Sequence, residues 1–289
     1  MTLAGETVWQ LGHGRSLSLG AHGHLMAIIN CTPDSFSDGG RHAGVEAAVA
    51  HALACVEEGA SILDIGGEST RPGAEPVSAQ EEQARVLPVI EALSRQTEAL
   101  ISIDTYRAET ARLAVAAGAH IVNDVYGLRY DARMAEVVAT SGAGLVMMHT
   151  GRGRAAEKLD DVIADQDLFF STSLKIADEA GIGRARIVLD PGFGFAKDRE
   201  EDLALMARFE ALQALGFPLL AGTSRKRFIG AITGRDVPAD RDVGTAATTA
   251  LLRIKGAHIF RVHAIAPNRD ALLMADAMLA ASLRQERHS

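Results

Sequence analysis

The chain has 289 residues, 47% of them hydrophobic and 23% charged, and its 29 basic and 37 acidic side chains give a formal net charge of −8. These proportions are typical of a globular protein with an extensive core, and the acidic balance argues against general nucleic-acid binding, which requires a surplus of lysine and arginine. No apolar run reaches the roughly 18 residues of a transmembrane helix and the N-terminus lacks the regions of a secretion signal, so we expect neither a membrane protein nor a secreted one.

The first predicted element is a small hairpin over residues 7–20. Eight short apolar runs follow it, and each ends in a polar or glycine-rich stretch. Because each run is nearly continuous in apolar residues instead of alternating, it is typical of a strand buried on both faces, as in a parallel sheet covered by helices. The runs are Leu25–Asn30, Ser61–Gly67, Ala99–Asp104, His120–Asp124, Gly144–His149, Arg186–Gly192, Pro218–Ser224 and His258–His263.

The segments between the runs are amphipathic and rich in alanine, which predicts helices over residues 45–59, 78–94, 107–118 and 199–216. Gly59, Gly118 and Gly216 stand where glycine commonly ends a helix, and Ser78 with Glu81 has the spacing of a capping box. Eight successive strand–helix units predict an α/β fold, a (β/α)8 TIM barrel that the whole chain, residues 1–289, forms as a single domain. An open, doubly wound sheet is the alternative.

Polar side chains stand at the end of every predicted strand, and in such a barrel the strand ends carry the reactive groups. One polar strand end usually forms a turn or cap, but eight of them would converge on one mouth. These residues are Asn30, Asp64 with Glu68, Asp104, Asn123 with Asp124, His149, Asp190, Ser224 with Lys226, and Arg261 with His263. The pattern therefore predicts a polar site at this end of the barrel.

Two loops, residues 30–40 and 66–73, combine hydroxyl groups with glycines. They are either long solvated loops or a lid and a phosphate clamp. In the second interpretation Arg71, Arg261 and His263 supply the positive charge, since arginine suits bidentate phosphate binding.

A second set of strand-end residues, Asp104, Asn123 and Asp190, could accept the N–H edge of a flat nitrogen heterocycle. Lys226 would balance the acids and donate to the ring. Ser224 is the expected N-cap of the following helix, which would leave backbone amides free for a substrate carboxylate. The alternatives are ordinary ones: a turn residue at Asp190 and a solvated lysine at Lys226.

Six stretches of the chain, taken in order, resemble the dihydropteroate synthase family of folate biosynthesis. They are MAIINCTPDSFSDGG, GASILDIGGESTRPGA, ISIDTYRAETARLAVAAGAHIVNDV, LDPGFGFAKD, LLAGTSRKRFIG and GAHIFRVHAI. The resemblance implies a transferase that joins 4-aminobenzoate to 6-hydroxymethyl-7,8-dihydropterin pyrophosphate, with Mg²⁺, and that releases pyrophosphate and 7,8-dihydropteroate. It also implies a homodimer and inhibition by sulfonamides, which resemble 4-aminobenzoate. The two cysteines, Cys31 and Cys55, have no metal or disulfide spacing, which indicates a reduced, cytoplasmic compartment.

The resemblance also assigns roles to individual residues. It makes Asn30 and Asp38 metal ligands, and it gives Thr70, Arg71, Arg261 and His263 to the pyrophosphate. The pterin pocket is matched by Asp104, Asn123, Met148, Asp190 and Lys226. The aminobenzoate site is matched by Phe36, Pro72, Phe195, Ser224 and Arg227. Pyrophosphate departure leaves a cation on an electron-rich ring, which the uncharged arylamine attacks, so an SN1-like reaction without a catalytic nucleophile is expected.

The chain departs from the family pattern in two places. After the fifth strand it reads His149-Thr150-Gly151-Arg152-Gly153-Arg154 where many members have MHMQG followed by proline. Arg227 stands where some members have a serine beside the aminobenzoate carboxylate.

Three other functions fit parts of the pattern. A corrinoid-methyltransferase type of pterin-binding barrel would lack the two loops at residues 30–40 and 66–73. A synthase paralogue without catalysis would share every motif. A barrel aldolase would use Lys226 as a Schiff-base nucleophile and would be trapped covalently by borohydride.

Overall fold

The computed structural model describes residues 7–31, 40–68, 77–155 and 157–286. Eight parallel strands lie side by side in the order β8-β7-β6-β5-β4-β3-β10-β9. One parallel bridge, Leu189 to Leu219, joins the two outer strands and brings the sheet round into a barrel. The predicted barrel is therefore confirmed, and the open sheet is excluded.

The strands of the barrel are short and buried, as their continuous apolar sequences predict. Their bounds are β3 His24–Asn30, β4 Ile62–Gly66, β5 Leu100–Asp104, β6 Ile121–Asp124, β7 Gly144–Met148, β8 Ile187–Asp190, β9 Leu220–Ala221 and β10 Ile259–Val262. Within this order each strand is hydrogen-bonded to its neighbours in register, for example Asn30 with Gly66 and Gly66 with Asp104. The strand ends therefore lie at one level, where they can share a site.

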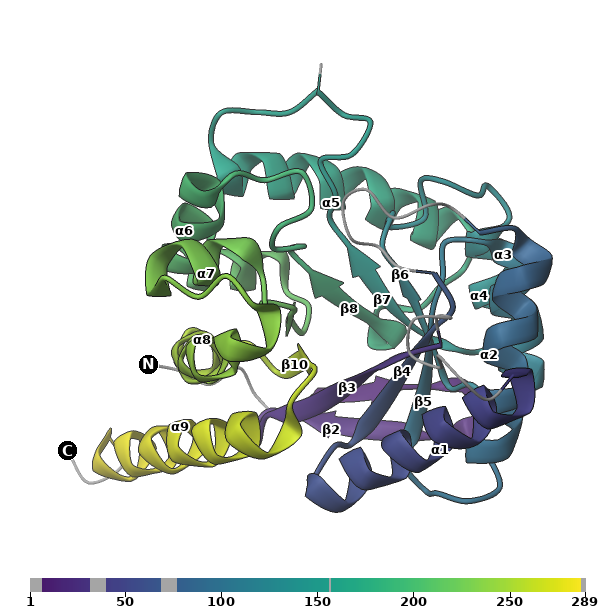
Figure 1. Cartoon of the computed structure of the whole chain (residues 1–289). Helices are drawn as coiled ribbons and strands as arrows, with labels where there is room; N and C mark the ends of the chain where they lie inside the picture. Colours follow the sequence, from purple (N-terminus) through teal and green to yellow (C-terminus); the bar gives the residue numbers. More distant parts are fainter. Residues whose placement is uncertain (1–6, 32–39, 69–76, 156, 287–289) are drawn as a thin grey trace.

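Helices surround the barrel (Figure 1). Their bounds are α1 Gly40–Glu58, α2 Ala79–Leu93, α3 Ala108–Ala116, α4 Met134–Ser141, α5 Val162–Glu179, α6 Arg199–Ala207, α7 Arg227–Thr233, α8 Asp242–Ile254 and α9 Ile265–Glu286. The larger core cluster lies between strands and helices, with side chains such as Leu63, Ile103, Phe169 and Phe260 almost fully buried. Among the described residues, no helix is long and apolar enough to cross a membrane.

The N-terminal hairpin closes the bottom of the barrel. It consists of β1 Thr7–Gln10 and β2 Ser16–Leu19, paired antiparallel, and it confirms the hairpin predicted over residues 7–20. Trp9, Leu11 and Leu19 pack against the inward-facing residues of the barrel strands in a second, smaller core cluster. Trp9 is 1% exposed and its Nε1 donates to the carbonyl oxygen of Arg186 at 2.9 Å. Side chains of the hairpin therefore fill this end of the barrel.

One local prediction differs from the structure, and another, the cap at Ser78, is confirmed. The helix predicted over residues 199–216 is two elements: α6 ends at Ala207 and a 3-10 helix continues over Phe209–Leu215. Phe209 and Leu212 are both buried at the three-residue spacing of a 3-10 helix, a spacing that an amphipathic α-helix shares. Ser78 accepts from the backbone N–H of Glu81, as a cap should, at 3.1 Å.

Candidate active site

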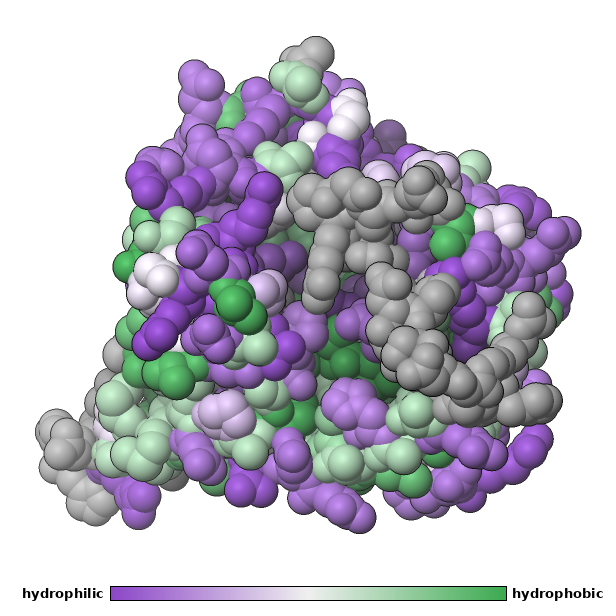
Figure 2. Space-filling model, in the orientation of Figure 1, coloured by the Kyte–Doolittle hydropathy of each residue, from purple (hydrophilic) through white to green (hydrophobic). Residues whose placement is uncertain are grey.

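A cavity of about 810 Å³ opens at the C-terminal ends of the strands. Figure 2 shows this face hollowed near its centre and bordered by hydrophilic side chains. The cavity is lined by every described residue to which the family resemblance assigns a role, namely Asn30, Asp104, Asn123, Met148, Asp190, Phe195, Ser224, Lys226, Arg227, Arg261 and His263. The remaining predicted site residues, Phe36, Asp38, Thr70, Arg71 and Pro72, lie outside the described residues.

Arg261 of β10 is held at the cavity by two carboxylates. Its Nε donates to Asp64 Oδ2 and its Nη2 to Asp104 Oδ2, both at 2.6 Å. Asn123 also donates to Asp64 Oδ2, at 3.1 Å. Burial opposes the charge on Arg261, but Asp64 and Asp104 outweigh this effect and raise its pKa. Arg261, a predicted phosphate ligand, therefore binds Asp104 of the predicted heterocycle pocket, so its guanidinium joins the two predicted sets of residues.

Asp190 and Lys226 form the second charged pair of the site. Burial raises the pKa of Asp190 to about 6, although the N–H of Gly192 donates to its Oδ1 at 2.8 Å. Burial, and then the positive charge of Arg261, lower the pKa of Lys226 to about 8. Both groups are therefore mostly charged at neutral pH, and each has a pKa about one unit from pH 7.

Two cationic side chains lie over the ring of Phe195, which is in the loop between β8 and α6. Lys226 Nζ lies 4.3 Å from the ring centroid and Arg152 Cζ lies 5.1 Å from it. Such contacts are favourable where water is partly excluded. They place an aromatic wall next to the charged pair, on the side of the cavity formed by the β8–α6 loop.

Ser224 does not cap the helix that follows it, so this prediction is wrong. The N-cap of α7 is Lys226, which makes no side-chain cap bond. Ser224 Oγ instead accepts from the backbone N–H of His263 at 3.1 Å and its hydroxyl lies 2.9 Å from His263 Nδ1. Arg227 is exposed and, within the part of the chain that the structure describes, makes no hydrogen bond or ion pair with another side chain.

Two strand-end residues do not face the cavity. His149 is 1% exposed and its ring packs outward against Phe169 of α5, with centroids 4.7 Å apart. Asp124 accepts from the backbone N–H groups of Tyr126 and Leu128, at 2.9 and 2.7 Å, and so forms a turn. Asp124 is therefore the ordinary turn-forming residue of a polar strand end, whereas the side chain of His149 contacts Asp165 and Lys197 behind the cavity.

Asp64 and Lys197 are two of the charged residues at the site for which no role was predicted from the sequence. Asp64 is fully buried beneath Arg261, and its Oδ1 has no hydrogen-bond partner among the described residues. Lys197 lines the cavity and is only 8% exposed. The sequence signal for Lys197 is its position directly after the apolar, glycine-rich run Pro191–Ala196.

The sequence profile of a family described as "Pterin binding enzyme" matches residues 26–263. The dihydropteroate synthase of Bacillus subtilis (strain 168) is 46% identical over 255 residues, which cover 88% of each chain. The Xanthomonas albilineans dihydropteroate synthase with 4-aminobenzoic acid is 47% identical and superimposes with a TM-score of 0.89, covering 95% of this chain and 99% of that one. The same enzyme in complex with 7,8-dihydropteroate gives 44% identity, a TM-score of 0.85, and coverage of 94% and 99%.

Proposed function

Since this chain belongs to the dihydropteroate synthase family, we propose that the cavity at its strand ends is the site where 4-aminobenzoate is joined to 6-hydroxymethyl-7,8-dihydropterin pyrophosphate. The amine nitrogen bonds to the methylene carbon, the bond from that carbon to the diphosphate oxygen breaks, and the amine releases a proton. The observation that carries the proposal is one cavity lined by Asp104, Asn123, Asp190, Lys226 and Arg261. These groups match the donors and acceptors of a pterin beside an anion.

The pterin is proposed to bind between Asp104, Asn123 and Asp190, with Met148 as an apolar neighbour. An ionised carboxylate accepts two N–H groups at once, and the aminopyrimidinone edge of a pterin offers several in a line. Asp190 Oδ1 is already occupied by the N–H of Gly192, so Oδ2 is the oxygen left for the ring. Lys226 is the donor proposed for a ring carbonyl or nitrogen.

The diphosphate is proposed to bind Arg261 and His263, together with Thr70 and Arg71 from the loop outside the described residues. Arg261 commits Nε and Nη2 to Asp64 and Asp104, which leaves its remaining N–H groups for phosphate oxygens. As the carbon–oxygen bond breaks, negative charge grows on the leaving oxygen and fixed cations stabilise it. The nearby carboxylates favour the pterin cation that remains, which supports SN1-like departure.

The aminobenzoate is proposed to lie against Phe195, with Ser224 and Arg227 near its carboxylate and with Phe36 and Pro72 as further walls. The arylamine is uncharged at neutral pH, so its attack requires no strong base or covalent nucleophile. Closure of the site would protect the cation from water. Lys226 packs on the ring of Phe195, where its charge can stabilise a neighbouring anion, and trapping with borohydride distinguishes this role from that of a Schiff-base nucleophile.

Mg²⁺ is proposed to bind at Asn30, with Asp38 as a second ligand. Among the described residues no three His, Cys, Asp or Glu side chains gather into a metal cluster. This fits Mg²⁺, which is commonly held by one or two protein oxygens plus the phosphates of a substrate, and Asn30 offers an amide oxygen at the cavity. When bound, the ion would neutralise diphosphate charge.

A homodimer is proposed through α8 and α9, which pack against each other and carry an exposed apolar strip. The strip consists of Val243 (81% exposed), Leu251 (52%), Leu273 (58%), Met274 (71%) and Met278 (45%). Contiguous exposed apolar side chains of this kind mark interaction surfaces, and hydrophobic residues gather in this lower left region in Figure 2. Light scattering on the protein as it elutes from a size-exclusion column tests the proposal. Met274→Glu should convert a dimer to a monomer, and a monomeric wild type would refute the proposed dimer.

A direct assay tests the proposed function. The purified protein is incubated with the pterin pyrophosphate, 4-aminobenzoate and Mg²⁺, and dihydropteroate and pyrophosphate are quantified. Equimolar formation of both products is expected, and its absence would reject catalysis in favour of pterin binding alone. The two cysteines are free and buried, which supports a reducing, cytoplasmic compartment for the protein, so the assay uses a reducing buffer.

A further inference from the structure

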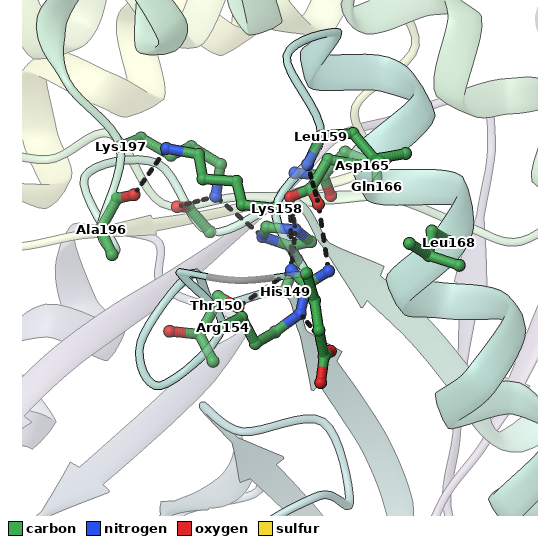
Figure 3. A network of polar contacts seen from close by, with 12 residues as sticks. His149, Thr150, Arg154, Lys158, Leu159, Asp165, Gln166, Leu168, Ala196 and Lys197 are labelled. Atoms are coloured by element: carbon green, nitrogen blue, oxygen red, sulfur yellow. Dashed lines mark hydrogen bonds and ion pairs between the residues drawn. The ribbon is translucent and has the colours of Figure 1, made fainter.

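A buried polar network lies behind the cavity, between β7, α5 and the β8–α6 loop (Figure 3). Its centre is His149, whose Nε2 lies 2.8 Å from Asp165 Oδ2 and whose Nδ1 lies 2.9 Å from Lys197 Nζ. Arg154 donates to both oxygens of Asp165, at 3.3 and 3.0 Å. The four residues His149, Asp165, Arg154 and Lys197 are each 8% exposed or less. Burying four ionisable groups is costly unless they are mutually satisfied, so their arrangement is strongly specified.

The chemistry of the donors fixes the tautomer of His149. A lysine ammonium can only donate, so Nδ1 accepts from Lys197. Nε2 lies 3.2 Å from Arg154 Nη1, another donor, and 2.8 Å from Asp165 Oδ2, an acceptor, so the ring proton is assigned to Nε2 and to the shorter bond with Asp165. Burial lowers the pKa of His149 to about 4, and burial lowers the pKa of Lys197 to about 8. At neutral pH the imidazole is therefore neutral and the lysine is charged, as the hydrogen bonds require.

Lys197 connects this network to the proposed pterin site. Its Nζ also donates to the carbonyl oxygen of Gly192, at 3.0 Å. The N–H of the same glycine donates to Asp190 Oδ1 at 2.8 Å, and the N–H of His149 donates to the carbonyl oxygen of Asp190 at 2.8 Å. Gly192 has φ +66°, and a Cβ there would lie 2.0 Å from the carbonyl oxygen of His149. The loop therefore passes directly over His149. Asp190 is hydrogen-bonded to the backbone of His149, and Gly192 is connected to the His149 ring through Lys197.

We propose that Lys197 and His149 are positioning residues for the pterin: neutral His149, oriented by Asp165, accepts from Lys197, and Lys197 holds the Gly192 turn that aims Asp190 into the cavity. The inference rests on the proposed function, because it takes Asp190 as a pterin ligand. Lys197 itself need not touch the substrate. Its effect would pass through Gly192 to the carboxylate.

The first test compares Lys197→Met with Lys175→Met. Methionine keeps much of the lysine stem and removes the donor, while Lys175 is an exposed lysine of α5, 76% exposed, and serves as the matched control. We expect Lys197→Met to raise KM for the pterin pyrophosphate about tenfold, the loss expected for one hydrogen bond to a buried turn. KM for 4-aminobenzoate and the affinity for inorganic pyrophosphate should stay at the wild-type values. A residue with a purely structural role would lower the melting temperature and the active fraction without this split.

The second test separates the two nitrogens of His149. In His149→Asn the side-chain oxygen can take the place of Nδ1 and accept from Lys197, whereas in His149→Gln the amide nitrogen can take the place of Nε2 and donate to Asp165. We expect the asparagine variant to retain the pterin KM more closely than the glutamine variant. Thermal melts of both variants identify any general loss of folding.

Three results would overturn the inference. One is an unchanged pterin KM in Lys197→Met, another is a fall in pyrophosphate affinity that matches the rise in pterin KM, and the third is an equal pterin KM in the two His149 variants. A wild-type protein that makes no dihydropteroate would instead reject the proposed function. The two failures are therefore distinguishable in the same set of assays.

Discussion

Arg261 and Asp64 meet beneath the cavity, where the Nε of the arginine donates to Oδ2 of a fully buried aspartate at 2.6 Å. The aspartate is two strands away from the arginine in the barrel, on β4, with β3 between them. A buried carboxylate that loses a cationic partner is strongly destabilising. Arg261 therefore has two tasks, since it neutralises the interior of the barrel and presents its free N–H groups to an anion.

Replacing Arg261 by alanine should affect both tasks. The affinity for inorganic pyrophosphate should fall by about 2–4 kcal/mol, from the loss of charged hydrogen bonds. The free energy of unfolding should fall by about 3–5 kcal/mol, because Asp64 is left unpaired. Calorimetry measures the first and urea denaturation the second. The double variant Arg261→Met with Asp64→Leu is the control, in which most of the stability should return while the pyrophosphate affinity stays low.

Replacing Asp190 by asparagine should abolish measurable binding of the pterin, because the amide turns its NH2 group, a donor, either toward the N–H of Gly192 or toward the N–H groups of the ring. Asp104→Ala should also abolish measurable binding of the pterin. Asp178→Ala, an exposed position on α5, is the matched control and should bind like the wild type. Titration calorimetry with the pterin pyrophosphate decides the matter, and undiminished binding to Asp190→Asn would remove that residue from the pocket.

Pterin affinity should have a maximum near neutral pH. Asp190, with its pKa raised to about 6, loses its charge on the acid side, and Lys226, with its pKa lowered to about 8, loses its charge on the basic side. Ligand binding needs both charges, so affinity should decline on either side of this window. Calorimetry from pH 5 to 9 at constant ionic strength, in steps of about half a unit, measures the profile. In Lys226→Met the basic limb should disappear, and a flat wild-type profile would contradict the assignment.

The stability of the ligand-free protein should follow pH in the opposite sense at Asp190. Its pKa is raised from 3.8 in the unfolded reference to about 6, so between these values the folded state holds the proton more tightly. The free energy of unfolding contributed by this group therefore falls as pH rises through that window. Denaturation of wild type and Asp190→Asn at pH 4 and at pH 7 isolates the effect. The advantage of the asparagine variant should be larger at pH 7, and an equal difference at both pH values would show that burial leaves this carboxyl unperturbed.

The exposed Arg227 should contribute modestly to the binding of 4-aminobenzoate. A solvent-exposed cation typically contributes below about 1 kcal/mol to an ion pair, so Arg227→Ala should raise KM for 4-aminobenzoate by less than about fivefold and the effect should shrink in high salt. Sulfonamides should compete with 4-aminobenzoate in wild type and variant alike. Arg235→Ala is a control at another exposed arginine. A large, salt-independent effect would place Arg227 inside the aminobenzoate site.

Turnover should depend on Mg²⁺. Chelation with EDTA should stop dihydropteroate formation and added Mg²⁺ should restore it, because the diphosphate leaves more readily when its charge is neutralised. Asn30→Ala should raise the Mg²⁺ concentration needed for half-maximal rate, while the melting temperature stays unchanged because Asn30 is exposed at the strand end. Undiminished activity in EDTA would exclude a metal requirement.

Sequence patterns predicted the barrel and most of the cavity, because buried parallel strands are continuous apolar runs and their ends meet by topology. They could not predict which strand-end side chains face inward. Successive side chains of a strand alternate between faces, so a displacement of one residue turns His149 from the cavity to α5. The pairing of Arg261 with Asp64 was equally out of reach, since it depends on rotamers of residues distant in the chain. Asp64 was recognised as a polar strand end without a role for the same reason.

The hairpin around Trp9 has a consequence for how ligands reach the cavity. Trp9, Leu11 and Leu19 fill the end of the barrel opposite to the strand ends that line the cavity. A ligand of the cavity therefore has to enter and leave on the side of the strand ends. In the proposed reaction both substrates and both products would use this same face of the molecule, so a bound product would obstruct the next substrate.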